Sequence, residues 1–304
     1  MDPCIGIERT PALLPPVQGV SHHWLKAGDA CLHYASAGDE RGGPLVVLLH
    51  GFPELWYAWR HQLVALAGSH HVVAPDLRGY GLSSRPAGRD AYRISRLVDD
   101  VRRLADHLGA RRIVLVGHDW GGVVAWAFAT RHPDRVAKLV IINAPHPAIL
   151  ARQLRRSPRQ MLASSYILLF RAPFRLAERV LRAGDHAILE QLLTRGRRRG
   201  YFTSDDEAVY RVAWRAPGAL TASLQYYRSA SLRGTQGVAR VRSPTIVVWG
   251  ERDRYLRPGM LDGLDAYVSD LEIVRVPDAS HWIVHERPAL ITRVIADAAA
   301  AAPE

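Results

Sequence analysis

The sequence predicts an α/β protein in which a mostly parallel central sheet is flanked by helices and interrupted by an inserted helical block. Two observations predict this class. Short apolar runs rich in β-branched residues alternate with stretches of helical periodicity, and the alternation stops near Pro145 and resumes near Thr245. The chain has 304 residues, 48% of them hydrophobic and 23% charged, as expected of a globular protein with a sizeable core. Extended disorder, a fibrous repeat and a coiled coil are therefore excluded.

The first half of the chain contains four runs typical of buried strands. They lie at 45–49, 72–74, 113–116 and 139–142. Between the second and third runs, apolar residues from Ile94 to Leu108 recur every three or four positions with charged residues opposite, which predicts an amphipathic helix. Buried strands joined by crossover helices imply a parallel sheet covered on both faces, with its ligand crevice at the carboxyl ends of the strands. Functional side chains are therefore expected just after each strand.

The interval after Pro145 contains no good strand. Its apolar positions fall at helical spacing and prolines punctuate it, so we expect a helical cap. Two more runs, at 245–249 and 271–276, and a closing helix from Pro288 to about Ala298 complete the sheet. The expected organisation is a first part of the core at 1–145, a cap at 146–230 and a second part of the core at 231–304.

The formal net charge of +11 is concentrated in one segment. Between Ala151 and Gly200 there are 12 arginines against three acidic residues, with the densest run at 195–199. No aromatic residues on which bases could stack interleave this run, and no nucleic-acid-binding motif surrounds it. A solvated surface is the expected role of the segment, and a nucleic-acid partner is not expected.

Two cysteines, Cys4 and Cys31, are too few for a disulfide framework or a cysteine-ligated metal site, which fits a reducing compartment. No stretch approaches the roughly 18 apolar residues that a membrane span requires, and the N-terminal region lacks a signal-peptide pattern. We therefore expect a cytoplasmic protein without a membrane span. The oligomeric state stays open, with a homodimer as one candidate.

The run at 113–116 leads into Gly117-His118-Asp119-Trp120-Gly121-Gly122, directly before a helical stretch. Glycines two before and two after Asp119 give the spacing of a nucleophile elbow, a sharp strand-to-helix turn that holds its central side chain above the sheet. An aspartate cannot replace the serine of an esterase, but a carboxylate attacks a saturated carbon that carries a leaving group or ring strain. We therefore predict that Asp119 is such a nucleophile and not only a helix cap.

Two further strand ends offer a base and an acid. His281 follows the last strand, on a loop where a neutral imidazole can take a proton from water. Asp253 follows the run at 245–249 and could orient that histidine, with Glu251 the stronger and Asp278 the weaker competing carboxylate. The order nucleophile, acid, histidine at three strand ends predicts one catalytic constellation.

The turn His50-Gly51-Phe52-Pro53-Glu54 follows the first clear strand, and its backbone can face the elbow. We predict that the backbone N–H groups of Phe52 and Trp120 donate to a developing oxyanion. Pro53 can make the peptide bond before it cis, which would direct the turn. For His50 we expect a structural hydrogen bond that holds the loop.

Residues 50–54, 76–84 and 117–122 read HGFPE, DLRGYGLSS and GHDWGG. Together these segments resemble the epoxide hydrolases of the α/β-hydrolase fold, across essentially the whole chain. Haloalkane dehalogenases share the aspartate and the tryptophan after it. Their first segment resembles HGNP, with asparagine at the position where this chain has Phe52. Fluoroacetate dehalogenases typically have an arginine after the nucleophile, where this chain has Trp120. A small anionic substrate is therefore disfavoured.

The resemblance also implies two cap tyrosines that hydrogen-bond the epoxide oxygen. A tyrosine followed by a phenylalanine and then a proline resembles the first such segment, which gives this role to Tyr166. The sequence Leu224–Arg228 resembles the second, which gives it to Tyr227, although Gln225 stands where asparagine is usual. Because Tyr226 is adjacent, the sequence leaves open which of the two phenols faces the site.

The implied reaction converts a lipophilic epoxide and water to a vicinal diol through an alkyl ester on Asp119, with no metal and no organic cofactor. His281, oriented by Asp253, would activate the water that hydrolyses the ester. The aromatic and aliphatic surroundings of Trp120, Phe170 and Trp282 favour a lipophilic substrate. The alternative is a haloalkane dehalogenase with the same nucleophile. A binding module without catalysis is disfavoured because it would not need nucleophile, acid and base together.

Overall fold

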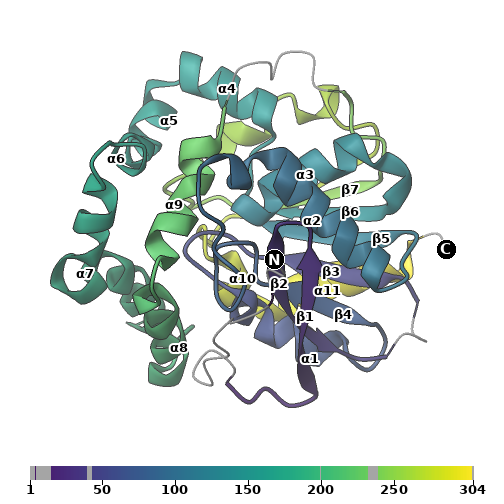
Figure 1. Cartoon of the computed structure of the whole chain (residues 1–304). Coiled ribbons are helices and arrows are strands. Elements are labelled where there is room, and N and C mark those ends of the chain that lie inside the picture. Colours follow the sequence, from purple (N-terminus) through teal and green to yellow (C-terminus); the bar gives the residue numbers. More distant parts are fainter. Residues whose placement is uncertain (1–3, 5–14, 40–42, 199, 232–238, 303–304) are drawn as a thin grey trace.

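The computed structural model describes Cys4 and residues 15–39, 43–198, 200–231 and 239–302. A sheet of eight strands crosses its centre in the order β1-β2-β4-β3-β5-β6-β7-β8 (Figure 1). The strands are β1 (Val20–Ala27), β2 (Ala30–Ala37), β3 (Leu45–Leu49), β4 (Val72–Pro75), β5 (Ile113–His118), β6 (Val136–Ile142), β7 (Thr245–Gly250) and β8 (Leu271–Val276). Neighbours from β4 to β8 run parallel, whereas β2 pairs antiparallel with both β1 and β4. The predicted α/β class with a mostly parallel sheet is thus confirmed.

The six apolar runs predicted as strands are all strands of the sheet. Strands β3, β4, β5 and β7 are buried along their whole length, as continuous apolar runs between two helical layers should be. The hairpin of β1 and β2 was not predicted. Strand β1 alternates between exposed and buried positions and carries His22, His23 and Lys26, so it has no apolar run by which to recognise it.

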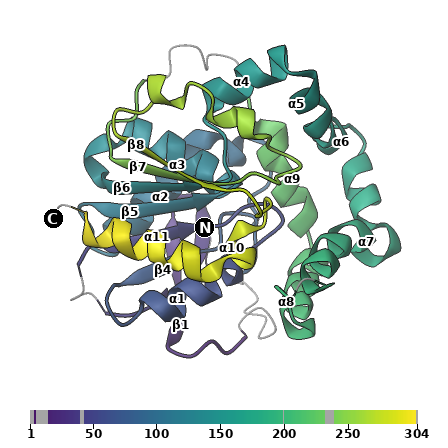
Figure 2. The ribbon, with the colours of Figure 1, turned by 180° about the vertical axis from the view of Figure 1, so that it is seen from behind.

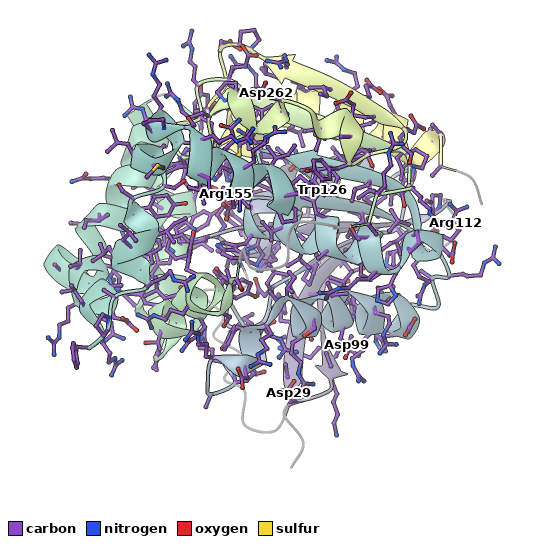
Figure 3. The ribbon with its side chains drawn as sticks, turned by 90° about the horizontal axis from the view of Figure 1, so that it is seen from above. Asp29, Asp99, Arg112, Trp126, Arg155 and Asp262 are labelled. Atoms are coloured by element: carbon purple, nitrogen blue, oxygen red, sulfur yellow. A yellow bond between two sulfur atoms is a disulfide. The ribbon has the colours of Figure 1, made fainter. Side chains whose placement is uncertain are left out.

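Helices cover both faces of the sheet. The pair α1 (Arg60–Leu66) and α11 (Pro288–Ala300) lies on one face, and the pair α2 (Ile94–His107) and α3 (Trp120–Arg131) on the other (Figures 1 and 2). Helices α2 and α11 occupy the positions predicted from periodicity. In Figure 3, Asp99 of α2 and Trp126 of α3 lie over the same face, and Trp126 is buried against the core. The short helix α10 (Ile283–Glu286) precedes α11.

In the described part of the interval between β6 and β7 there are six helices. They are α4 (Pro147–Arg156), α5 (Pro158–Ala163), α6 (Tyr166–Phe170), α7 (Leu176–Arg198), α8 (Ser204–Arg215) and α9 (Ala219–Ser229). Helix α7 is interrupted at 183–186, where the backbone leaves the helical region. This group lies beside the carboxyl ends of the strands and contacts the core, for example through the Trp214 indole N–H, which donates to the carbonyl of Pro53 at 2.7 Å. Arg60 also pairs with Asp206 of α8 across the same boundary, at 3.0 Å.

Cys4 and Cys31 form a disulfide, with their Cα atoms 5.0 Å apart. A disulfide is not expected in the reducing compartment that the scarcity of cysteines predicts. A sequence separation of 27 residues gives no sign of the pairing, because the contact depends on the tertiary structure that brings Cys4 to Cys31. In the arginine run at 195–199, the side chains and the whole of Arg199 lie outside the described residues. Among the helices that the structure describes, none is both long and apolar enough to cross a membrane.

Candidate active site

Asp119 occupies the elbow between β5 and α3 with φ 49° and ψ −119°, a region that L-residues rarely adopt. The glycines on either side of Asp119 leave room for this turn because they have no side chain. A Cβ atom on Gly117 would lie 2.5 Å from the carbonyl oxygen of Gly121, and one on Gly121 would lie 2.2 Å from that of Leu49. Because both obstacles are backbone atoms, no larger residue fits at either position. The elbow predicted from the glycine spacing is therefore present, and it holds the Asp119 side chain at the edge of the sheet.

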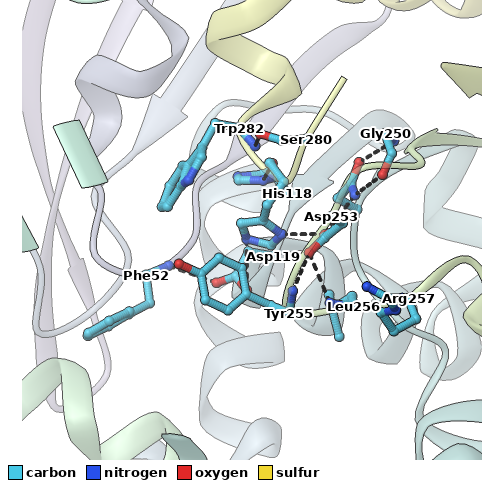
Figure 4. Close-up of polar contacts among 12 residues, drawn as sticks. Phe52, His118, Asp119, Gly250, Asp253, Tyr255, Leu256, Arg257, Ser280 and Trp282 are labelled. Atoms are coloured by element: carbon cyan, nitrogen blue, oxygen red, sulfur yellow. Dashed lines mark hydrogen bonds and ion pairs between the residues drawn. The ribbon is translucent and has the colours of Figure 1, made fainter. Parts of the chain in front are cut away.

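The two carboxylate oxygens of Asp119 face different partners. The Phe52 N–H donates to Oδ1 at 2.8 Å, and Nε2 of His281 lies 3.6 Å from Oδ2 (Figure 4). Burial acts to raise the Asp119 pKa, but His281, His118 and the Phe52 N–H outweigh it and lower the pKa below its ordinary value. Asp119 is therefore ionised at neutral pH, as a carboxylate nucleophile must be.

Asp253 holds the opposite side of the His281 ring. Its Oδ2 accepts from Nδ1 of His281 at 2.7 Å, and its Oδ1 accepts the backbone N–H groups of Tyr255 at 2.7 Å and Leu256 at 2.9 Å (Figure 4). Burial alone would lower the His281 pKa, but the charges and hydrogen bonds of Asp253 and Asp119 raise it well above its ordinary value. The two carboxylates therefore favour the protonated form of His281.

The two rival carboxylates are engaged elsewhere. Glu251 pairs with Arg275 at 2.9 Å, and the exposed Asp278 pairs with Arg287. Neither pair includes His281, whereas Asp253 is fully buried against it. The geometry thus favours Asp253 as the acid.

Asn143 is a residue of the site that the sequence analysis missed. It follows β6 with φ 41°, is fully buried, and donates from Nδ2 to Oδ2 of Asp253 at 2.7 Å. Its Oδ1 accepts the N–H of Gly250 at 2.8 Å, which ties the end of β6 to the end of β7. The signal available in the sequence was its place as the first polar residue after the run at 139–142. With Asn143, every oxygen of the Asp253 carboxylate has at least two donors.

A buried polar cluster lies behind the histidine. Glu54 accepts from His118 at 3.2 Å and from His285 at 2.5 Å, and the other ring nitrogen of His118 donates to the backbone carbonyl of His281 at 2.9 Å. Burial would raise the Glu54 pKa, but the two histidines lower it instead. Glu54 was quoted in the sequence analysis only as part of a motif, and the structure shows that it supports the His281 loop through His118.

His50 has the structural role that was predicted for it. One ring nitrogen lies 2.9 Å from the carbonyl of Gly51, and the other accepts the N–H of Leu77 at 3.1 Å. The Phe52–Pro53 peptide bond is cis, also as predicted. Together these features present the Phe52 N–H to Asp119. Trp120 is the first residue of α3, where backbone N–H groups have no acceptor within the helix and are free to serve a ligand.

The two predicted cap tyrosines lie together over the Asp119 elbow. The ring of Tyr227 packs 5.1 Å from Trp120, 5.4 Å from Phe52 and 6.1 Å from Tyr166, measured between ring centroids. Burial and the charge of Asp119 raise the pKa of both tyrosines, so their hydroxyl groups stay protonated and can donate. Tyr226 points elsewhere, since its hydroxyl donates to the carbonyl of Arg78 at 2.8 Å. This geometry favours Tyr227 over Tyr226 as the second donor.

Tyr255 also borders the site, although the sequence analysis gave it no role. Its ring lies 5.3 Å from that of His281 and 5.7 Å from that of Tyr166. The site is thus ringed by aromatic groups of both core and cap. Among the described residues, no group of three or more His, Cys, Asp or Glu side chains is arranged to hold a metal ion.

Comparisons with known proteins agree with this geometry. Residues 44–288 match the family model of the alpha/beta hydrolase fold. The AB hydrolase superfamily protein YfhM of Bacillus subtilis is 40% identical over 92% of this chain and 98% of its own length, and human epoxide hydrolase 4 is 36% identical over 95% and 81%. Among solved structures, an epoxide hydrolase of Bacillus megaterium in complex with an inhibitor has a TM-score of 0.84 at 34% identity, covering 90% of this chain and 99% of that one.

Proposed function

We propose that this chain, which belongs to the α/β-hydrolase fold family, is an epoxide hydrolase that converts a lipophilic epoxide to a vicinal diol through an ester on Asp119. The observation that carries the proposal is the position of one ionised carboxylate between the His281–Asp253 pair of the core and the two tyrosines of the cap. One relative and one structural neighbour that are named epoxide hydrolases support it.

The first step opens the epoxide ring. Oδ1 of Asp119 accepts the Phe52 N–H at 2.8 Å, whereas Oδ2 lies 3.6 Å from His281, so Oδ2 is the less tightly held oxygen and attacks a ring carbon from the side opposite its C–O bond. The new Oδ2–C bond forms as the C–O bond breaks, and its electron pair moves to the ring oxygen. Tyr166 and Tyr227 donate hydrogen bonds to this oxygen as its charge develops. It then takes a proton from one of the phenols.

The same step prepares the base for the next one. Esterification removes the negative charge of Asp119, which is one of the groups that raise the His281 pKa. The pKa of His281 therefore falls in the intermediate, and the proton that it releases restores the phenol by way of water. The imidazolium of the resting site becomes the neutral base that hydrolysis requires.

The second step hydrolyses the ester. His281 takes a proton from water, and the hydroxide adds to Cγ of Asp119, which places negative charge on Oδ1. The Phe52 N–H already contacts this oxygen, and the Trp120 N–H is the proposed second donor. The negative charge on Oδ1 returns to re-form the carbonyl as the Cγ–Oδ2 bond breaks, and the departing alkoxide takes the proton from the His281 imidazolium. The new carboxylic acid of Asp119 then gives its proton to His281, so the diol leaves with an oxygen that came from Asp119. The water oxygen stays in the carboxylate.

A lipophilic substrate fits the surroundings of Asp119. The rings of Phe52, Phe170 and Tyr227 pack against one another, with centroids 4.9 to 5.4 Å apart. Trp282 lies on the far side of His281, with ring centroids 5.2 Å apart. These side chains offer apolar contact and few hydrogen bonds beyond those aimed at the epoxide oxygen.

The test is diol formation from a panel of aryl and alkyl epoxides, in parallel with halide release from 1-haloalkanes. We expect diol without halide, and a loss on the order of 10⁵-fold or more in Asp119→Asn, which keeps the size of the side chain. A single turnover in ¹⁸O-water should place the label in Asp119 and not in the diol. Label in the diol would contradict the ester intermediate. Halide release without diol would assign the protein to the dehalogenases.

Three finer features belong to the same proposal. We take residues 146–230 as a cap that carries both tyrosines, between core segments 1–145 and 231–304. The homodimer and the cytoplasmic location stay predictions. Because disulfides are typical of oxidising compartments, the Cys4–Cys31 bond argues against the cytoplasm, and fractionation of the source cells is the test.

A further inference from the structure

Large apolar side chains are exposed on one part of the cap. The described residues expose seven of them, and six lie between 161 and 188: Met161, Leu162, Leu168, Phe174, Leu176 and Ile188. The seventh, Val64, belongs to α1. Phe174 is 86% exposed, and Leu162 and Leu168 are each 76% exposed. Single exposed apolar residues are ordinary, but this concentration on one stretch marks an interaction surface.

The same stretch is strongly cationic. Seven exposed arginines accompany the apolar residues: Arg155, Arg156, Arg159, Arg171, Arg175, Arg179 and Arg182. The sole acidic residue between 151 and 184 is Glu178, which is 2% exposed and forms two hydrogen bonds of 2.8 Å with Arg228. We call these six apolar side chains and seven arginines the basic apolar face. One exposed acidic residue, Asp185, lies within the same stretch, and it pairs with Arg215, which is not part of the face.

The basic apolar face lies along one edge of the molecule. Helices α5, α6 and α7 follow one another down the side of the cap that faces away from the sheet (Figures 1 and 2). The face is therefore accessible to a large partner without displacement of the core.

The turn between α6 and α7 is the centre of the face. Phe174 and Arg175 both have positive φ, 58° and 56°, and both side chains are exposed. Beside them is a surface cavity of about 360 Å³ lined by four arginines, Arg89, Arg171, Arg175 and Arg228. Since Glu178 neutralises Arg228, the other three leave a net positive charge there. An apolar ring thus protrudes next to a hollow suited to an anionic group.

Charge and polarity together select the partner. A second copy of the chain docking through the same face about a two-fold axis would set arginine against arginine, which is unfavourable. A nucleic acid would match the arginines but would gain little from exposed leucine, methionine and phenylalanine side chains. A bilayer with anionic headgroups matches both the positive charge and the apolar side chains of the face, because apolar side chains enter the acyl boundary while arginines pair with phosphates. We propose that the basic apolar face docks the cap on an anionic lipid surface.

The test is co-sedimentation of the whole protein with vesicles of phosphatidylcholine, with and without phosphatidylglycerol. We expect binding to the vesicles that contain phosphatidylglycerol, weakened by salt, and little binding to phosphatidylcholine alone. The variant Phe174→Asn should lower the partition coefficient about tenfold, because one buried aromatic ring is lost. Asparagine adopts positive φ more readily than phenylalanine, so this change is compatible with the fold. The double variant Arg179→Gln, Arg182→Gln should lower binding to the vesicles that contain phosphatidylglycerol and leave the weak binding to phosphatidylcholine vesicles unchanged.

The matched control is Val64→Ser, which removes the exposed apolar side chain that lies outside the face. It should bind as the wild type does. The proposal is overturned if the wild type ignores anionic vesicles, or if Phe174→Asn and Val64→Ser behave alike. It is also overturned if the protein binds DNA but not vesicles, or if Phe174→Asn changes the molar mass in solution, which would indicate a self-interface. Because none of these readouts uses diol formation, the result is independent of the proposed function.

Discussion

The core side and the cap side of the candidate site are held by different contacts. In the core, His281 contacts Asp253 at 2.7 Å and Asp119 at 3.6 Å, and the elbow is fixed by glycines that tolerate no larger residue. In the cap, Tyr227 is placed mainly by ring packing against Phe52 and Trp120. The first arrangement depends on individual atoms, and the second on shape.

This difference teaches where substitutions should act. A missing atom in the core removes a charge or a proton acceptor that the reaction uses, so rates should fall by several orders of magnitude. In the cap, two phenols share the donation of hydrogen bonds to the epoxide oxygen, and the helices that carry them are exposed on their outer side. Substitutions in the cap should therefore lower the rate less. Four substitutions test this contrast, in order of expected size.

The largest effect is expected for His281→Gln. Without the base the ester forms but is not hydrolysed, so turnover should fall on the order of 10⁵-fold. Intact-mass spectrometry should then show the protein with one substrate attached. The control is His146→Gln, which changes a buried histidine that packs between Trp126 and Tyr267. Equal turnover in both variants would remove His281 from the mechanism.

Next is Asp253→Asn, with an expected loss on the order of 10⁴-fold, because the ring of His281 loses its acceptor and orientation. The pH profile should also move. Asp253 raises the His281 pKa, so its neutralisation lowers that pKa, and the neutral base is present at lower pH. The acid limb of ester hydrolysis therefore shifts to lower pH. Asp278→Asn, on the same loop as His281, should leave the limb in place, and an unshifted limb in Asp253→Asn would refute the assignment.

The cap side is tested by a pair of neighbours. Tyr227→Phe should slow ring opening on the order of 10²-fold in single-turnover measurements, because one donor to the epoxide oxygen is lost. Tyr226→Phe should leave ring opening nearly unchanged and lower the free energy of unfolding by about 1 kcal/mol, since its hydroxyl bonds Arg78. The reverse pattern would exchange the two roles.

The smallest effect on rate is expected at the boundary between cap and core. Trp214→Phe removes the 2.7 Å hydrogen bond to Pro53 and leaves that carbonyl without this donor. The free energy of unfolding in urea should fall by about 1 to 2 kcal/mol, with turnover within a few-fold of wild type. A loss of turnover as large as that of Tyr227→Phe would show that this contact also positions the tyrosines.

The features that the sequence by itself determined are local ones. The glycines around Asp119, the apolar runs at the strands and the periodicity from Ile94 to Leu108 each act over a few residues, so a short window contains their physical cause. The order of Asp119, Asp253 and His281 could be predicted for the same reason, because each follows its own strand. These observations were sufficient to predict the fold class and to propose the chemistry.

The tertiary structure alone decided what depends on distant partners. Asn143 meets Asp253 across 110 residues, and Tyr226 is distinguished from Tyr227 only by the Arg78 carbonyl that it reaches. The β1–β2 hairpin and the Cys4–Cys31 bond are likewise fixed by pairing across the fold. The exposed side of the cap also depends on the tertiary structure. Apolar residues at helical spacing predict a buried stripe, and only the packing of α5, α6 and α7 shows which side chains remain in solvent.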